Sequence, residues 1–289
     1  MKPPPFAYAA PDTVEEAVGL LTEHADAEPR VLAGGQSLIP VMKLRLAAPA
    51  HLIDISRLGM DSIAETGGHL AIGALARHRD LERSDLLKAR YPVMAAAAPQ
   101  ISDPIVRNLG TIGGSLCHAD PAGDWGSVML ALQASVVLRS GRGEREMPIS
   151  EFLEDTFTTA LEPDEILTEV RVPQPAGSSG GTYLKMERKV GDFATVAAAL
   201  HLSLSNGTIE RAGIGLTAVG SKNLQATDAE ASLAGAEPTE AAFAEAGRLA
   251  AEASSPVTDV RGSAEYKRHI VDVYVRRGLA TALEKARAA

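Results

Sequence analysis

Two short segments, Ala33-Gly34-Gly35-Gln36-Ser37 and Thr111-Ile112-Gly113-Gly114-Ser115, each place a glycine pair after an apolar run. Glycine adopts positive φ angles easily and lets a ligand approach the backbone closely. Successive backbone N–H groups in a tight turn form a concavity that suits anionic oxygens. Two ordinary turns are the alternative, because Gly-Gly pairs are common in loops. The repetition of the pattern favours a shared site for a diphosphate.

Composition indicates a folded chain whose partners are small molecules or proteins. The 289 residues are 45% hydrophobic, enough for two or three compact units. A net charge of −9 gives no support for binding nucleic acid or an anionic membrane. Neither a run of ~18 apolar residues nor the apolar core of a signal peptide is found. We therefore expect a cytoplasmic protein without a membrane span.

Cysteine and histidine usage argues against metal chemistry on this chain. Cys117 is the single cysteine, whereas an iron–sulfur cluster takes about four thiolates. Any such cluster would have to lie on a partner chain. The seven histidines are scattered without the spacing of a zinc site. No metal site is expected.

The first 58 residues predict a small α/β unit. Apolar residues recur at helical spacing over 13–24, and a second helix is expected over 38–46. Short apolar runs at 30–32 and 51–55 are typical of strands. This order places the first glycine segment at the end of a strand, where α/β sheets usually bind ligands.

Residues 59–175 form a second expected subdomain, with an antiparallel sheet and helices. Strands are expected at 69–74, 135–139, 145–149 and 166–172, and helices at 77–87 and 92–98. Asp120 and Pro121 are a helix cap followed by proline at the first helical position, so a helix is expected to begin there.

A segment rich in Pro, Gly and Ser, 173–181, marks the boundary of a C-terminal domain over 180–289. The turn Ser205-Asn206-Gly207 is a strong hairpin signal. Strands are expected at 183–189, 195–204 and 208–219, followed by helices at 239–253 and 263–288. Sheets with segregated helices predict an α+β fold.

One motif is expected to be misleading. Residues 213–218 match G-x-G-x-x-A, the pattern of a dinucleotide-binding turn, which requires a helix directly after it. Here the apolar residues continue through Val219, so a strand that contains glycines is the better interpretation.

Several polar residues have both a structural and a functional interpretation. Asp124 could accept hydrogen bonds from ligand hydroxyls or be a solvated residue in a first helical turn. Lys185 and Phe193 belong to a segment with Arg188 and Lys189 that is either a surface strand and turn or a cationic patch beside a redox cofactor. Cys117 is expected to be a small buried thiol, because no base is held beside it. No side chain is assigned a catalytic role.

Taken together, these motifs resemble the FAD-binding medium subunit of molybdenum hydroxylases, most closely the aerobic carbon monoxide dehydrogenase group. The resemblance covers essentially the whole chain. It rests on AGGQSLIPVMKLRL at 33–46, IGA at 72–74, DPIVRNLGTIGGS at 103–115, ADPAGD at 119–124, KVGDFA at 189–194 and SAEYKR at 263–268.

The resemblance implies a two-part FAD-binding domain followed by a C-terminal domain. It also implies a complex, usually a dimer of heterotrimers, in which a large subunit holds molybdopterin and a small subunit holds two [2Fe–2S] clusters. Electrons would pass from those clusters through FAD to an external acceptor. The residues implied to hold FAD are Ala33, Gly34, Gly35, Gln36, Ser37, Thr111, Ile112, Gly113, Gly114 and Ser115 at the diphosphate, Asp124 at the ribityl chain, and Lys185 and Phe193 at the isoalloxazine.

One departure concerns the substrate. Carbon monoxide dehydrogenases of the best-known type often have histidine where this chain has Gln36. With glutamine at this position, the chain is similar to medium subunits that act with N-heterocycles or aldehydes. A self-contained FAD oxidoreductase of the same fold is the alternative function. A scaffold that uses the glycine segments only as turns is a third.

Overall fold

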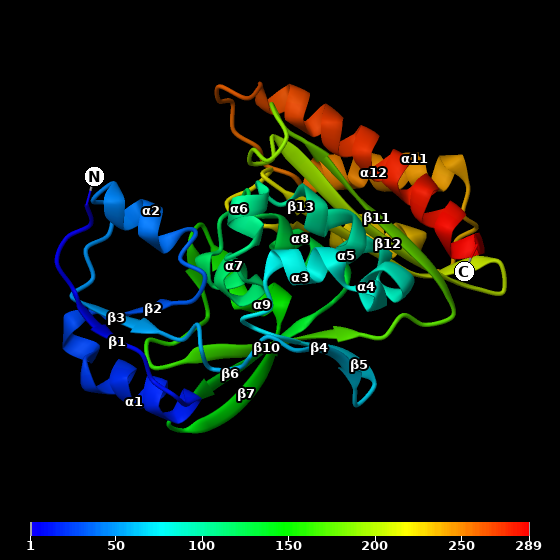
Figure 1. Ribbon diagram of the computed structural model, residues 1–289. Helices are drawn as coiled ribbons and strands as arrows, with labels where there is room; N and C mark the ends of the chain where they lie inside the picture. Colours follow the sequence, from blue (N-terminus) through cyan, green and yellow to red (C-terminus); the bar gives the residue numbers. More distant parts are fainter. Residues whose placement is uncertain (1, 289) are drawn as a thin grey trace.

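The computed structural model describes residues 2–288 as three units around three main sheets (Figure 1). The first unit is a parallel sheet in the order β1-β3-β2, and it confirms the expected small α/β unit. The second helix is shorter than expected and ends at Lys43, and Arg45 adopts φ +64°. The elements are β1 (Ala7–Ala9), α1 (Val14–Glu23), η1 (Ala25–Ala27), β2 (Arg30–Leu32), α2 (Leu38–Lys43) and β3 (His51–Asp54).

The second unit contains the expected antiparallel sheet, in the order β4-β5-β10-β6-β7. β4 is a strand that was not predicted, and it pairs with β5 through a Gly67-Gly68 turn in which both residues have positive φ. The strands are β4 (Ile63–Thr66), β5 (His69–Gly73), β6 (Ser135–Ser140), β7 (Gly143–Pro148) and β10 (Ile166–Pro173), with a small hairpin of β8 (Leu153–Asp155) and β9 (Thr158–Thr159).

The helices of this unit correct two predictions. The helix expected over 77–87 is split, because the Ser84 hydroxyl caps a new helix by accepting from the Leu87 N–H at 3.3 Å. Asp120 does not begin a helix, since its carboxylate closes a turn by accepting from the Ala122 N–H at 2.9 Å. The helices are α3 (His78–Arg83), α4 (Asp85–Arg90), α5 (Pro92–Ala97), η2 (Ala98–Gln100), α6 (Pro104–Arg107), α7 (Ile112–His118), α8 (Asp124–Ala131) and α9 (Ile149–Phe152).

The C-terminal unit is an antiparallel sheet in the order β11-β12-β13-β14 with helices on one face. Asn206 and Gly207 both have positive φ, as a type I′ hairpin requires, which confirms the predicted turn. β11 begins at Ser178, inside the segment expected to be a boundary. The elements are β11 (Ser178–Met186), β12 (Val196–Ser205), β13 (Thr208–Thr217), β14 (Leu224–Gln225), α10 (Thr227–Leu233), α11 (Glu240–Ala253) and α12 (Ala264–Ala288).

β12 is buried on both faces and joins the second and third units. Ala197 and Ala199 belong to the core that includes α5 and α8, whereas Ala198 and Leu200 belong to the core under α11 and α12. Alternate residues of a strand point to opposite faces, so one strand serves both cores. The α+β class is confirmed.

The glycines of the G-x-G-x-x-A match are packing residues. Both lie in β13, where α8 crosses the sheet at backbone distance. A Cβ atom at Gly213 would lie 1.9 Å from the Ala131 carbonyl oxygen, and one at Gly215 would lie 1.9 Å from that of Ser127. The motif is therefore a strand, as the sequence predicts, and glycine is needed for close approach of the helix.

Replacing Gly213 with alanine is expected to lower the free energy of unfolding by about 3 kcal/mol, because overpacking forces α8 away from the sheet. Urea denaturation would measure the loss. Gly141→Ala is the matched control, since a Cβ there meets nothing within 4 Å, and its effect should stay below about 0.5 kcal/mol. Equal losses in the two variants would contradict the packing account.

Candidate cofactor site

The two glycine segments lie against each other in the fold. A Cβ at Gly34 would lie 2.1 Å from the carbonyl oxygen of Leu109, two residues before the second segment. A Cβ at Gly114 would lie 3.8 Å from the Ala33 Cβ. In Figure 1 the first unit, in blue, lies beside the helices of the second unit that include α7. The structure thus brings together segments 78 positions apart in the sequence.

The first segment has free backbone donors. Between residues 2 and 288, no acceptor takes a hydrogen bond from the N–H groups of Ala33, Gly34, Gly35, Gln36 or Ser37. Gly35 adopts φ +70°, and the Gln36 side chain folds back to donate to the Gly34 carbonyl at 3.1 Å. Free, half-buried N–H groups need a partner. This segment therefore fits an anionic ligand.

The second segment differs from the loop that was expected, because it forms the first turns of α7. The N–H groups of Ile112 and Gly113 donate to Ala76 and Ala74 at 3.0 and 2.9 Å. Those of Gly114 and Ser115 donate to the hydroxyl and carbonyl oxygens of Thr111 at 3.1 and 3.0 Å. The expected role for these four amides is corrected: those of Gly114 and Ser115 close the helix, and those of Ile112 and Gly113 tie it to the segment that follows β5. The groups left for a ligand are the Thr111 N–H and the hydroxyls of Thr111 and Ser115.

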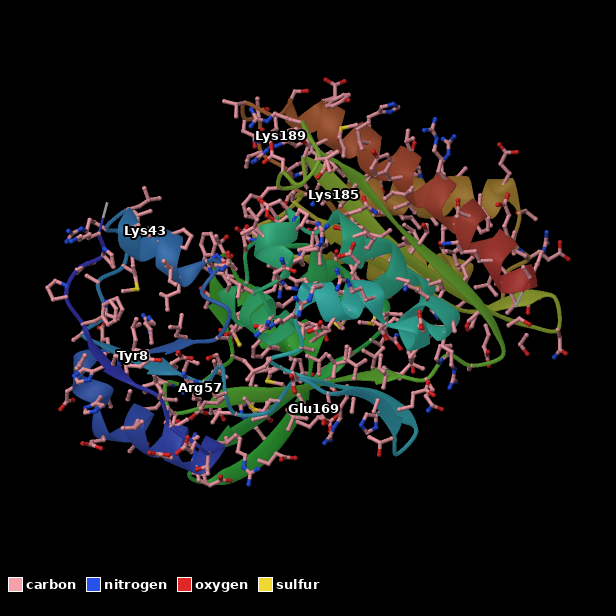
Figure 2. The ribbon with its side chains drawn as sticks, in the orientation of Figure 1. Tyr8, Lys43, Arg57, Glu169, Lys185 and Lys189 are labelled. Atoms are coloured by element: carbon pink, nitrogen blue, oxygen red, sulfur yellow. The ribbon has the colours of Figure 1, made fainter. Side chains whose placement is uncertain are left out.

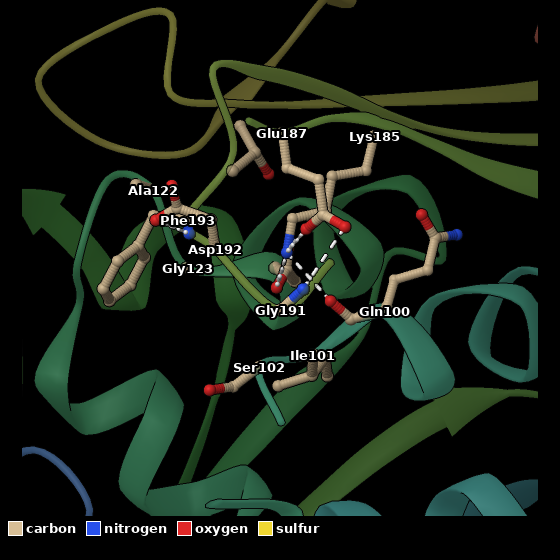
Figure 3. Close-up of polar contacts among 12 residues, drawn as sticks. Gln100, Ile101, Ser102, Ala122, Gly123, Lys185, Glu187, Gly191, Asp192 and Phe193 are labelled. Atoms are coloured by element: carbon tan, nitrogen blue, oxygen red, sulfur yellow. Dashed lines mark hydrogen bonds and ion pairs between the residues drawn. The ribbon is translucent and has the colours of Figure 1, made fainter. Parts of the chain in front are cut away.

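Asp124 belongs to a buried cluster with Lys185. Figure 3 shows Lys185 with its neighbours Gln100 and Glu187. Its two carboxylate oxygens accept from the Tyr183 hydroxyl at 2.5 Å and from the Lys185 ammonium at 3.1 Å. The same ammonium donates to the Gln100 carbonyl at 2.9 Å and lies 3.6 Å from Glu187. Burial raises the pKa of Asp124, while Lys185 and the Tyr183 hydrogen bond oppose that rise. Both oxygens of Asp124 are thus already engaged within the protein.

Tyr183 and Glu187 also belong to this cluster, although they were not among the residues expected from the sequence. The sequence contained a signal for them, because residues 183, 185 and 187 are spaced two apart. Residues with this spacing point to the same face of a strand. Nothing in the sequence showed that Asp124 and the Gln100 carbonyl would meet them there. These contacts come from α8 and η2, which are packed on the sheet.

Phe193 lies on a fixed turn at the surface. Gly191 adopts φ +86°, and a Cβ there would lie 3.1 Å from the Ser102 carbonyl group. Asp192 pairs with Arg188 at 3.1 Å and with Arg261 at 3.3 Å. The Phe193 residue is 52% exposed. Figure 2 shows the nearby Lys189 on the same unit as Lys185, and Lys43 on α2 of the first unit. The turn thus offers an aromatic ring that is free to cover a ligand.

Cys117 does not have the surroundings of a nucleophile. Burial raises the pKa of its thiol to about 12, and burial lowers the pKa of the neighbouring His118. The His118 ring stacks at a tilt on Phe157, with centroids 5.0 Å apart. A thiol needs a depressed pKa to react as a thiolate at neutral pH.

Iodoacetamide is therefore expected to leave Cys117 unmodified in the native protein at pH 8, where the buried thiol is protonated. Labelling should rise as the pH approaches 12, because the raised pKa keeps the thiol protonated below it. Mass spectrometry of native and urea-unfolded samples makes the comparison. Rapid labelling of the native chain at pH 8 would contradict this environment.

Metal clusters and membrane spans are features of other protein classes. Over residues 2–288, no group of three or more His, Cys, Asp or Glu side chains is placed to hold a metal ion. In the same part of the chain, no helix has the length and apolar character needed to cross a membrane.

Comparison with known proteins supports FAD as the cofactor. Residues 4–175 match the FAD binding domain in molybdopterin dehydrogenase, and residues 181–282 match the CO dehydrogenase flavoprotein C-terminal domain. The carbon monoxide dehydrogenase medium chain of Hydrogenophaga pseudoflava is 40% identical over 96% of this chain and 97% of its own. The 6-hydroxypseudooxynicotine dehydrogenase complex subunit alpha of Paenarthrobacter nicotinovorans is 39% identical, over 99% of this chain and 97% of its own.

A solved structure agrees with these matches. Carbon monoxide dehydrogenase from Hydrogenophaga pseudoflava, in a form that lacks the Mo-pyranopterin moiety of the molybdenum cofactor, superposes with a TM-score of 0.95 and 42% identity. The superposition covers 99% of each chain. The chain belongs to the family of FAD-binding medium subunits of the molybdenum hydroxylases, which are oxidoreductase subunits.

Proposed function

We propose that this chain is the electron-transfer flavoprotein of a heterotrimeric molybdenum hydroxylase. It would accept electrons from the [2Fe–2S] clusters of a small subunit, which receive them from the molybdopterin centre of a large subunit, and deliver them to an external acceptor. Bound FAD supplies the redox chemistry, and the protein binds and orients it. A dimer of heterotrimers in the cytoplasm is the proposed assembly.

The free amides of Ala33 to Ser37 are the observation that carries the proposal. They lie beside the second glycine segment, so donors from both subdomains, 1–58 and 59–175, can reach one diphosphate. Thr111 and Ser115 would add hydroxyl groups to the site. Ile112, Gly113 and Gly114 would shape the backbone surface that the diphosphate approaches. The 180–289 domain would contribute Phe193 and Lys185 near the isoalloxazine.

Asp124 and Lys185 would act as a unit in this site. Because both oxygens of Asp124 are occupied, we propose that its main effect on the cofactor is to hold the Lys185 ammonium in place. Three directions around that ammonium point to Asp124, Gln100 and Glu187, and the Glu187 contact is the longest. A polar atom of the cofactor would therefore replace the Glu187 contact more easily than the other two.

The substrate is proposed only as a class. The two relatives named for carbon monoxide and 6-hydroxypseudooxynicotine are 40% and 39% identical to this chain, so similarity does not separate them. This is consistent with a substrate pocket on another subunit. The proposed substrates are carbon monoxide, an aldehyde or an N-heterocycle.

A test compares the whole complex with this chain alone. The complex is purified through a tag on this chain, and flavin reduction by a substrate panel is followed by absorbance at about 450 nm. The proposal expects rapid reduction in a complex that contains molybdenum and iron, and none when FAD-loaded chain is used alone. Substrate-driven reduction by the isolated chain would instead support a self-contained oxidoreductase.

A further inference from the structure

We propose that His78, held in its uncharged form by Trp125, is a positioning residue for the second glycine segment and thereby for FAD binding. The inference rests on the proposed function, because it assigns the residue an effect on the cofactor. His78 does not belong to either glycine segment.

The His78 backbone and ring both contact the residues that lead into Thr111. The His78 N–H donates to the Gly110 carbonyl at 3.0 Å. In the same β-bridge, between Arg77 and Thr111, the Ile112 N–H donates to the Ala76 carbonyl at 3.0 Å. A Cβ at Gly110 would lie 2.9 Å from both Cδ2 and Nε2 of the His78 ring. The ring therefore forms the surface on which the Gly110-Thr111 backbone rests, and it sets the direction in which α7 begins.

Trp125 of α8 fixes this ring. Its indole Nε1–H donates to Nδ1 of His78 at 3.0 Å, with both residues buried. An indole can only donate, so Nδ1 must be the unprotonated nitrogen and the neutral ring carries its proton on Nε2. A ring protonated on both nitrogens could not accept this bond. The contact thus couples the placement of the second segment to the charge state of His78.

The charged surroundings reinforce the neutral form. Two of the elements that pack against α3, namely α5 and η2, contain no titratable side chain. A third element, α6, contributes Arg107, which pairs with Glu82 of α3 at 2.9 Å. On α8, Asp124 is engaged by Lys185 and Tyr183. Burial, followed by Arg107, lowers the pKa of His78 to about 4. The ring is uncharged at neutral pH and gains a proton only in acid.

Variants of the tagged complex test the hydrogen bond. After removal of FAD, the dissociation constant for added FAD is measured by flavin fluorescence. His78→Asn keeps an acceptor oxygen near the position of Nδ1 but lacks the ring atoms beneath Gly110, so it should weaken FAD binding less than His78→Leu does. His78→Leu leaves the buried indole without an acceptor and should weaken binding about tenfold or more.

A pH profile separates positioning from simple packing. Burial and Arg107 hold the pKa of His78 at about 4, and a ring protonated on both nitrogens cannot accept from Trp125. FAD affinity of the original complex should therefore fall as the pH drops from 6 toward 4. The His78→Asn complex has no ring to protonate, so its FAD affinity should fall less over the same range.

Two results would overturn the inference: equal weakening of binding by His78→Asn and His78→Leu, or an equal fall of FAD affinity from pH 6 toward 4 in the original and His78→Asn complexes. If His78→Leu does not fold, the pH profiles of the original and His78→Asn complexes still decide. Absence of FAD from the original complex is a different outcome, since it would contradict the proposed function itself.

Discussion

Replacing Gly34 with alanine is expected to weaken FAD binding by about 100-fold, equivalent to about 2.8 kcal/mol. The new Cβ would lie 2.1 Å from the Leu109 carbonyl oxygen, and that oxygen belongs to backbone that cannot turn aside as a flexible side chain can. The first segment would have to move away from the second, and the amides of residues 33–37 would no longer face the same ligand as Thr111 and Ser115. FAD dissociation from the tagged complex measures the effect.

Gly19→Ala is the matched control for this variant. Gly19 lies in α1, and a Cβ there meets nothing within 4 Å. Alanine at an open helical position should leave FAD affinity unchanged and raise stability slightly. Normal affinity in a folded Gly34→Ala complex would contradict the view that the two segments bind one group together.

Replacing Lys185 with methionine is expected to lower the free energy of unfolding by about 3–5 kcal/mol. The ammonium side chain is 1% exposed, and its loss leaves Asp124 and Glu187 without their buried cation. A buried carboxylate without a partner is costly, and Asp124 would retain only the Tyr183 hydrogen bond. Chemical denaturation of the full chain measures the loss.

A double-mutant cycle separates the ion pair from packing. Asp124→Asn combined with Lys185→Met removes one unpaired charge, so the double variant should be more stable than the sum of the single losses predicts. Lys189→Met is the control, because this neighbouring lysine is exposed and should change stability by less than about 0.5 kcal/mol. Additive losses would show that Asp124 and Lys185 are not coupled.

Local patterns were sufficient to predict much of the fold. The hairpin at Asn206-Gly207 requires two residues that tolerate positive φ, and the sequence provides them. The strands around β10 have the apolar content typical of buried strands. The G-x-G-x-x-A match could be rejected because no helix follows it, although its packing role needed the position of α8.

Other features depend on contacts between distant segments. The second glycine segment is helical because Thr111 caps it and the segment after β5 binds its first amides, and a Gly-Gly pair alone does not predict this. Likewise, Asp124 meets Lys185 across 61 positions and Trp125 meets His78 across 47. Residue type and spacing could identify both glycine segments, but not which of their amides would remain free.

The position of the FAD diphosphate in the native complex tests the central claim most directly. An experimental structure of the tagged complex with its cofactor should place diphosphate oxygens within about 3 Å of N–H groups of residues 33–37 and near the Thr111 or Ser115 hydroxyl. The free amides of the first segment are the groups that should be occupied. A diphosphate bound elsewhere, with those amides left to water, would contradict the account.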